Sequence, residues 1–239
     1  MLNYAHRGFK AKYPENTMLA FRKALDAGAD GIELDVHLSK DGHLVIIHDE
    51  NLLRTCGCDV FVKDLNLEEL KKLNAAYGYD GTDEKIPTLR EYFDFVKDTN
   101  LITNIEIKNG LIAYDGIEEK LYELMKEYEI CDRIIISSFN HESVLRMKEI
   151  DSTLKLGFLE ESVLANPVKY LKDNGIFYFH PLVNTVDKDL VSKLHNEGIF
   201  VNAWLSSKLS YNLEDFVEMG FDGLITDFPD RVDELLKNK

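Results

Sequence analysis

Residues 31–49 have the sequence GIELDVHLSKDGHLVIIHD, which is typical of two strands joined by an Asp-Gly turn. Because side chains alternate along a strand, Glu33 and Asp35 would lie on the opposite face from their apolar neighbours. Two adjacent carboxylates are costly to bury unless a cation lies between them. The second apolar run ends in His48, so this segment contains two candidate metal ligands and one candidate acid–base residue. A surface hairpin with solvated charges fits less well, because the carboxylates lie among apolar residues.

On both sides of this segment, short apolar strands alternate with amphipathic helices, giving eight strand–helix units. Parallel strands joined by crossover helices produce this order, and eight units in 239 residues predict a closed (β/α)8 TIM-type barrel. An open doubly wound sheet is the alternative, but no G-x-G-x-x-G motif follows any predicted strand. The expected strands cover residues 2–5, 31–36, 102–107, 133–137, 154–158, 177–180, 199–204 and 223–226. The expected helices cover residues 18–27, 67–73, 89–97, 116–128, 141–149, 167–174, 188–197, 213–219 and 231–237.

One less regular tract, from about residue 50 to residue 86, follows the second strand. It contains a short predicted helix, with Asn66 as its cap and Glu69 at the capping-box position. The sequence has no linker and no low-complexity stretch that would separate a second domain. We therefore predict one TIM-barrel catalytic domain over residues 1–239, with a small insertion at about residues 50–86.

The charge and cysteine content exclude several classes of protein. With 28 basic and 43 acidic residues, the chain has a formal net charge of -15, which disfavours binding to nucleic acid or anionic membranes. Cys56, Cys58 and Cys131 lack the spacing of a zinc ribbon and are expected to be free thiols. There is no signal-peptide pattern and no apolar span of about 20 residues, so we expect a cytoplasmic protein without a membrane span.

Carboxylates stand at the predicted C-terminal ends of two strands, where the active site of a TIM barrel lies. Glu33 and Asp35 are on the second strand, and Glu106 is on the third strand of the barrel. Three converging carboxylates, without a cysteine and without a necessary histidine, suit a hard cation such as Mg²⁺ or Ca²⁺. Zinc would be expected to draw histidines, and the sequence has no H-x-H or H-E-x-x-H motif.

Two histidines and two cations stand at the same set of strand ends. His6 and His48, on separate loops, could flank one bond, one taking a proton and the other giving one. Arg7 and Lys108 would supply the local positive charge that the acidic surface lacks. A cation site, two imidazoles and two basic side chains around one anion fit phosphodiester cleavage.

An ordered set of motifs spans nearly the whole length of the chain. The motifs are His6-Arg7-Gly8, Glu15-Asn16-Thr17, Glu33-Leu34-Asp35, Lys40-Asp41-Gly42 with His48-Asp49, Leu53-Arg54-Thr55, Glu106-Ile107-Lys108, Ser137-Ser138-Phe139, and Thr226-Asp227 with Pro229. In these motifs the chain resembles the glycerophosphodiester phosphodiesterase family. The resemblance implies a TIM-type barrel, a divalent-metal site, and hydrolysis of glycerophosphodiesters to glycerol 3-phosphate and an alcohol. The tract at about residues 50–86 resembles the insertion of that family.

The resemblance also implies roles for single positions. It implies that His6 and His48 are the acid–base pair, and that Glu33, Asp35 and Glu106 are the metal ligands. It implies that Arg7 and Lys108 contact the phosphate and that Glu15 is a carboxylate that supports the site. Phe139 and Trp204 would form the aromatic wall. We expect one divalent metal ion, Mg²⁺ or Ca²⁺, and a small-molecule glycerophosphodiester substrate, and we allow for a homodimer.

Two alternative functions remain open at this point. A phospholipase D-type enzyme would use the same residues on lysophospholipids, and a non-catalytic barrel would only bind phosphodiesters. His180 matches no family role and is interpreted as structural rather than as a substrate contact. His37 is expected to lie past the end of the second strand.

Overall fold

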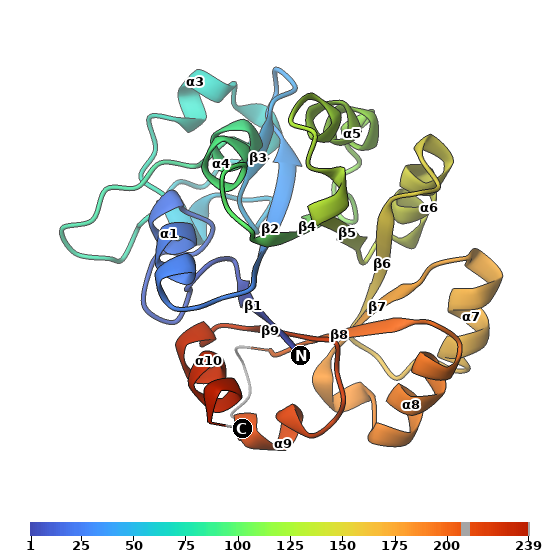
Figure 1. The fold of residues 1–239 in the computed structure, drawn as a ribbon. Coiled ribbons are helices and arrows are strands. Elements are labelled where there is room, and N and C mark those ends of the chain that lie inside the picture. Colours follow the sequence, from blue (N-terminus) through green and yellow to red (C-terminus); the bar gives the residue numbers. More distant parts are fainter. Residues whose placement is uncertain (207–210, 239) are drawn as a thin grey trace.

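The computed structural model describes residues 1–206 and 211–238, which form a barrel of parallel strands enclosed by helices (Figure 1). The strands are β1 (Leu2–His6), β2 (Gly31–Leu38), β3 (Leu44–Ile46), β4 (Ile102–Ile107), β5 (Ile134–Ser138), β6 (Lys155–Glu160), β7 (Tyr178–Pro181), β8 (Phe200–Trp204) and β9 (Gly223–Thr226). The α-helices are α1 (Met18–Asp26), α2 (Leu53–Cys56), α3 (Leu67–Leu70), α4 (Leu89–Val96), α5 (Ile117–Glu127), α6 (His141–Ile150), α7 (Pro167–Asn174), α8 (Lys188–Asn196), α9 (Leu213–Val217) and α10 (Pro229–Lys237). Short 3₁₀ turns are η1 (Val62–Asp64), η2 (Cys131–Arg133) and η3 (Val183–Thr185).

The sheet closes because β1 pairs in parallel with β2 on one side and with β9 on the other. All the strands except β3 follow one another around the barrel in chain order, so eight strands form the closed, parallel sheet. Strand β3 pairs antiparallel with β2 and completes the hairpin expected from residues 31–49. The predicted (β/α)8 TIM-type barrel is therefore confirmed.

Local sequence signals set the starts of several helices. The Thr17 side chain accepts a hydrogen bond from the Ala20 N–H at 3.2 Å, and Thr88 accepts one from the Glu91 N–H at 3.1 Å. Helix α3 ends at Leu70, three residues before the predicted end. Helix α10 begins at Pro229 rather than at residue 231, because proline suits the first turn of a helix.

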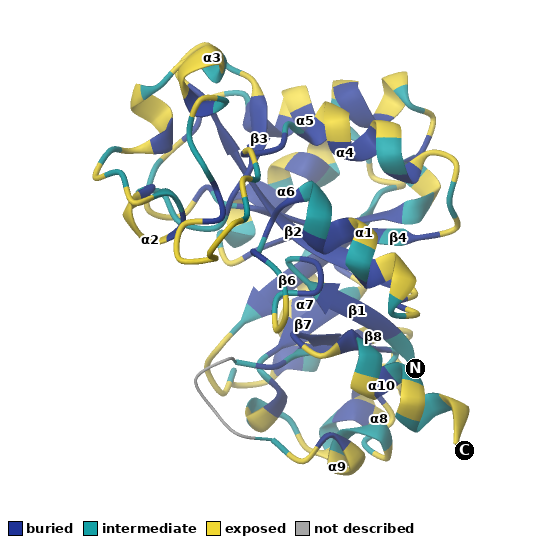
Figure 2. Cartoon of the chain, turned by 90° about the vertical axis from the view of Figure 1, so that its left-hand side faces the viewer, coloured by how far each residue is buried: buried dark blue, intermediate teal, exposed yellow. Residues whose placement is uncertain are grey.

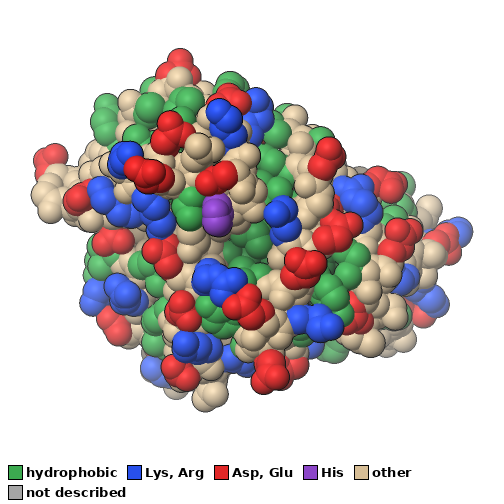
Figure 3. Space-filling model, turned by 90° about the horizontal axis from the view of Figure 1, so that it is seen from above, with side chains coloured by type: hydrophobic (Ala, Val, Ile, Leu, Met, Phe, Trp, Pro, Cys, Tyr) green, Lys and Arg blue, Asp and Glu red, His purple; other side chains and the backbone are tan. Residues whose placement is uncertain are grey.

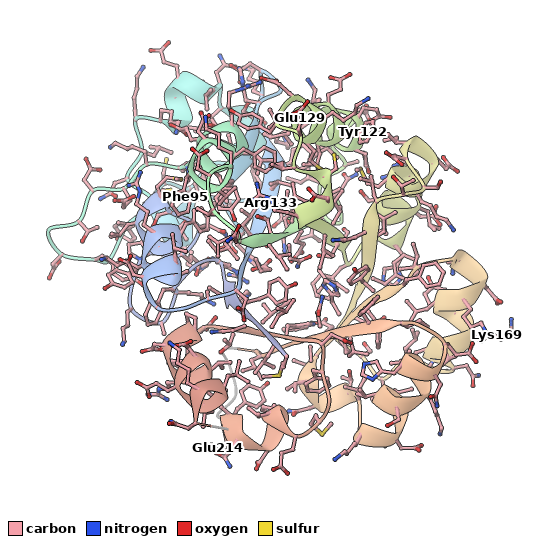
Figure 4. The ribbon with its side chains drawn as sticks, in the orientation of Figure 1. Phe95, Tyr122, Glu129, Arg133, Lys169 and Glu214 are labelled. Carbon is pink, nitrogen blue, oxygen red and sulfur yellow. The ribbon has the colours of Figure 1, made fainter. Side chains whose placement is uncertain are left out.

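The barrel interior is apolar at the N-terminal ends of the strands. Tyr4, Ile135 and Ile225 form a buried cluster there, with Tyr178 packed against it. Figure 2 shows the strands buried, while the outward faces of the helices are exposed. Arg133, labelled in Figure 4, donates to backbone carbonyls at the C-terminal end of α4 and so fixes that helix beside the start of β5.

The tract after β3 has an apolar cluster of its own, which supports it on the flank of the barrel (Figure 2). Irregular segments join α2, η1 and α3, and of these three elements the sequence predicted only α3. The cluster consists of Val45, Ile47, Leu52, Val62, Leu70, Ala75 and Ile86.

The prediction for His37 was wrong. Strand β2 continues to Leu38, so His37 lies within the strand, pairs with Val45 of β3, and is fully buried. The strand is longer than its apolar run because the antiparallel hairpin with β3 supplies hydrogen bonds for its last residues.

The surface carries many paired charges. On the face shown in Figure 3, acidic side chains are interspersed with basic ones. No disulfide joins Cys56, Cys58 or Cys131, and each is a free thiol in the described part of the chain. None of the helices within residues 1–206 and 211–238 has the length and apolar character needed to span a membrane.

Candidate active site

A cavity of about 260 Å³ opens at the C-terminal ends of the strands. A depression of about 410 Å³ near Arg90 and Lys120 is larger, but it contains none of the predicted site residues. The predicted residues that line a cavity therefore identify the site better than the volume of the cavity does. The predicted residues that line the smaller cavity are His6, Arg7, Glu33, His48, Glu106, Phe139 and Trp204.

Three carboxylates converge beside this cavity. Asp35 of β2 and Glu106 of β4 are direct neighbours in the parallel sheet, and Glu33 faces the same way as Asp35. All three residues are buried, and one oxygen from each lies within 4.8 Å of the others. Burial, and then the charges of Asp35 and Glu106, raise the pKa of Glu33 well above its ordinary value.

Asp35 provides a test of whether this cluster fits a metal ion. Its Oδ1 is buried and has no hydrogen-bond partner among the residues that the structure describes. An unpartnered carboxylate oxygen between two other buried carboxylates is the arrangement that a hard divalent cation satisfies. The donor set consists of oxygen alone, which suits Mg²⁺ or Ca²⁺. The residues therefore fit the expected metal.

Two basic side chains border the carboxylate cluster. The Lys108 Nζ lies 2.8 Å from the Glu106 Oε1 and 3.7 Å from the Asp35 Oδ1. The Arg7 Nε lies 3.4 Å from the Asp35 Oδ2. Burial alone would raise the pKa of Asp35, but His48, Arg7 and Lys108 together lower it below its ordinary value. The cations are thus held beside the cavity, where an anionic ligand would meet them.

The loop after β1 sets the position of Arg7. Arg7 has a φ of 55°, which is unusual for a residue with a side chain, and its N–H donates to the Glu33 Oε2 at 3.0 Å. At the next residue, Gly8, a Cβ would come within 2.7 Å of the Ala20 carbonyl carbon, and φ is +78°. Glycine is therefore required at position 8 to let the loop pack against α1.

Glu15 stands behind Arg7 rather than on the cavity wall. Its Oε1 accepts from the Arg7 Nη1 at 2.9 Å and from the Arg54 Nη2 at 2.6 Å. Burial opposes its ionisation, but hydrogen bonds from Arg54 and the charge of Arg7 lower the pKa of Glu15 to about 2. Glu15 therefore orients two guanidinium groups and joins the first loop to the insertion.

His6 is held by an aspartate from the other end of the chain. Its Nδ1 lies 2.6 Å from the Asp227 Oδ1, and its Nε2 lies 4.0 Å from the Glu33 Oε2. Because the carboxylate can only accept, we assign the Nδ1 proton to this hydrogen bond, which leaves the Nε2 lone pair free. Burial, and then the charge of Arg7, lower the pKa of His6 to about 4 in spite of Asp227. The imidazole is neutral at pH 7.

His48 stands at the end of the hairpin and lines the same cavity as His6. Its Nδ1 lies 2.6 Å from the Asp49 Oδ1, and its Nε2 lies 3.2 Å from the Lys108 Nζ. Arg54 holds Asp49 through an Nε to Oδ2 hydrogen bond of 2.6 Å. Both the ring and the hairpin end are thereby fixed.

His37 positions the backbone of His48. The His37 Nε2 donates to the His48 carbonyl at 3.1 Å, and its Nδ1 accepts from the Tyr114 hydroxyl at 3.0 Å. Burial lowers the pKa of His37 to about 4, so the ring is neutral and can make both bonds. Sequence reasoning missed this role because it placed His37 outside the strand.

The aromatic pair and His180 occupy different surroundings. Phe139 and Trp204 meet edge to face on the cavity wall, with centroids 6.0 Å apart. His180 is fully buried in the barrel, 3.3 Å from the Asn202 Nδ2, and does not line the cavity. Burial lowers the pKa of His180 to about 3, consistent with the structural interpretation.

Four site residues received no role from the sequence: Asp227, Asp49, Arg54 and Asn104. Asp227 follows the last strand and belongs to the motif Thr226-Asp227, but the sequence predicted no partner for it. Asp49 and Arg54 belong to motifs but are paired only by the fold. Asn104 is two residues before Glu106, so strand alternation places both on the same face. This spacing of two residues from Glu106 was the sequence signal that could have identified Asn104 as a site residue.

Comparisons with known proteins identify the family of the chain. The sequence model of the glycerophosphoryl diester phosphodiesterase family matches residues 6–231. A glycerophosphodiester phosphodiesterase of Caldanaerobacter subterraneus is 43% identical over 235 residues, which cover 98% of this chain and 96% of that protein. One from Bacillus altitudinis is 41% identical over 233 residues, covering 95% of each. The structure of an Oleispira antarctica phosphodiesterase in complex with the product sn-glycerol-3-phosphate superposes with a TM-score of 0.86, at 27% identity, over 98% of this chain and 96% of that one.

Proposed function

This chain belongs to the glycerophosphoryl diester phosphodiesterase family, and we propose that it hydrolyses glycerophosphodiesters to glycerol 3-phosphate and an alcohol. The observation that carries the proposal is the shared cavity. It is lined by two histidines, each bound to an aspartate, and borders a buried cluster of three carboxylates. The product bound to the Oleispira antarctica phosphodiesterase supports the same substrate class.

We assign Glu33, Asp35 and Glu106 as the residues that would hold one divalent cation, Mg²⁺ or Ca²⁺. When bound, such a cation would offset the negative charge of a phosphodiester and lower the pKa of an oxygen that it contacts. The cluster supports this assignment through its burial and through the unpartnered Oδ1 of Asp35.

The histidines and cations would act on the diester directly. His6 is neutral above about pH 4, and its Nε2 can accept the proton of the nucleophile, either a substrate hydroxyl or a water. His48, which must enter the reaction with a proton on Nε2 as well as on Nδ1, would then donate the Nε2 proton to the leaving alkoxide. Proton exchange with solvent would return both histidines to their starting states. Arg7 and Lys108 lie close enough to the cavity to bind the phosphoryl oxygens as negative charge accumulates there. Phe139 and Trp204 would contact the carbon skeleton of the substrate.

A coupled assay for glycerol 3-phosphate release tests the proposal. The purified chain, supplied with Mg²⁺ or Ca²⁺, should release glycerol 3-phosphate from glycerophosphodiesters whose alcohol group is choline, ethanolamine or glycerol. Absence of release from every diester with either metal would contradict the proposed function.

A lysophospholipid-cleaving phospholipase D is the second candidate, because apolar side chains stand exposed near the site. Leu111 after β4 is 85% exposed, Val163 after β6 is 79% exposed, and Phe139 after β5 is 44% exposed. We expect the water-soluble glycerophosphocholine to be the better substrate. A higher kcat/KM for lysophosphatidylcholine than for glycerophosphocholine would favour the second candidate.

Replacing Asp227 by Asn is expected to lower kcat by roughly 10- to 100-fold, as loss of a hydrogen bond to a charged group does. The amide can donate to Nδ1, which moves the ring proton to Nε2 and removes the lone pair that faces the cavity. The matched control is Asp222→Asn, because Asp222 also pairs with a histidine, His195, at 2.9 Å, but away from the cavity. Equal kcat losses in the two variants would contradict the role of Asp227.

The homodimer and the cytoplasmic location stay predictions. Analytical ultracentrifugation at several protein concentrations would test the first, and fractionation of the source cells would test the second.

A further inference from the structure

A buried asparagine without a hydrogen-bond partner forms part of the cavity floor. Asn104 of β4 is 1% exposed, and neither its Nδ2 nor its Oδ1 has a partner among residues 1–206 and 211–238. The same side chain lines the cavity that contains both histidines. Burying an amide without hydrogen bonds is unfavourable, so a partner from outside the chain is expected at this point.

The sheet register places Asn104 level with Glu33 and His6, and one inward-facing position nearer the N-terminal ends of the strands than Asp35 and Glu106. It is paired with Glu33 on β2 and lies one inward-facing position before Glu106 on its own strand. Ile225 of β9 also lines the cavity, and it belongs to the apolar cluster that fills the barrel below. The inner end of the cavity, which we call the floor, therefore presents the Asn104 amide and the apolar side chain of Ile225 beside Glu33.

Another asparagine at the site shows what a supporting role looks like. The Asn16 Nδ2 donates to the Asp35 Oδ2 at 2.8 Å and so holds a carboxylate of the cluster. Asn104 makes no such bond to Glu33 or Glu106, although both lie on adjacent inward-facing positions. Its amide is free to contact whatever enters the cavity.

The chemistry of the floor selects a hydroxyl. An amide offers one acceptor and a donor side by side, and a hydroxyl can use both, whereas a phosphate only accepts. Arg7 and Lys108, which attract the phosphate, stand nearer to the C-terminal ends of the strands.

We propose that Asn104 binds the terminal hydroxyl of the glycerol moiety and makes the site selective for glycerol that is unsubstituted at that carbon. This inference rests on the proposed function. An acyl group on that oxygen would remove the hydroxyl proton and would need space that Asn104 and Ile225 occupy. The floor thus discriminates against lysophospholipids.

The test compares glycerophosphocholine with its deoxy analogue, in which the terminal hydroxyl is replaced by hydrogen. For the wild-type protein with Mg²⁺, kcat/KM should be at least about tenfold lower for the analogue, because the amide then stays unpaired. Asn104→Leu, which has a similar volume and no polar atom, should reduce this preference to near one. Calorimetry with glycerol 3-phosphate and its deoxy analogue should show the same preference in affinity, without any turnover.

The matched control is Asn202→Leu. Asn202 is another buried asparagine inside the barrel, but it contacts His180 and does not line the cavity, so this variant should keep the wild-type preference. A wild-type protein that cleaves both compounds equally well would overturn the inference and leave the proposed function standing. So would an Asn104→Leu variant that keeps the preference, or one that loses Mg²⁺ affinity and both activities in equal measure. A wild-type protein that releases product from neither compound would overturn the proposed function itself.

Discussion

Alanine at position 6 or at position 48 is expected to reduce turnover of glycerophosphodiesters by about 10² to 10⁴-fold, the range typical of general acid–base residues. His6 and His48 line one cavity, and each has its Nδ1 fixed by an aspartate, which leaves Nε2 as the nitrogen that can exchange a proton with a ligand. In His48 this nitrogen also lies 3.2 Å from the Lys108 Nζ. When either ring is removed, water must replace the missing histidine in one of the two proton transfers. Steady-state kinetics of glycerol 3-phosphate release, with the fold verified by circular dichroism, measures the effect.

The leaving group can separate the two roles. A diester of p-nitrophenol has a leaving group that departs without a proton, so His48→Ala should lose much less activity on it than on glycerophosphocholine. His6→Ala should be slow on both substrates, because proton removal from the nucleophile is still required. The control is His195→Ala, an exposed histidine on α8. Near wild-type turnover in His6→Ala or His48→Ala would disprove the assigned role, and the reverse pattern would exchange the acid and the base.

Loss of the divalent cation is expected to reduce turnover by about 10³-fold or more, which corresponds to the several kcal/mol that such an ion supplies in transition-state charge stabilisation. Chelation should remove the activity, and added Mg²⁺ or Ca²⁺ should restore it. Glu33→Gln and Asp35→Asn should show the same loss of turnover even at metal concentrations that are sufficient for the wild type, because each removes one ligand of the cluster. Full activity in the presence of chelator would contradict the metal assignment.

The metal should also change stability in a pH-dependent manner. Glu33 has a pKa raised well above its ordinary value of 4.5, so between these two values the folded chain holds a proton that the unfolded chain has released. Stability from this group therefore falls as pH rises through that window. The melting temperature of the metal-free wild type should fall relative to that of metal-free Glu33→Gln as pH rises above about 4.5.

At neutral pH, bound Mg²⁺ should raise the melting temperature of the wild type above that of Glu33→Gln, because metal binding competes with the proton for the carboxylates. Saturation at 100 times Kd would add about 2.7 kcal/mol to the free energy of unfolding. Asp222→Asn leaves the cluster intact and should keep the wild-type response to Mg²⁺. A melting temperature that is independent of Mg²⁺ at pH 7 would argue against a metal at this cluster.

Much of the fold follows from patterns within single elements. Alternation along residues 31–36 puts Glu33 and Asp35 on one face, and the same rule puts Asn104 and Glu106 together on β4. Eight repeats of strand and helix then require a closed parallel sheet, and closure brings the strand ends to one rim. The carboxylate cluster was predictable because its members lie on adjacent strands at positions that these two rules define.

The rest of the site depends on contacts between segments that no periodic pattern relates. His6 and Asp227 are 221 residues apart and meet only because β1 and β9 close the barrel. The position of the His48 backbone depends on His37, which the antiparallel pairing with β3 draws into the sheet. Composition and local periodicity alone therefore determined the barrel and the face on which its charges stand. Tertiary structure decided that Asp227 is the partner of His6 and that Lys108 lies beside His48, since hydrogen bonds and charge interactions act over a few ångströms in space, whatever the separation along the chain.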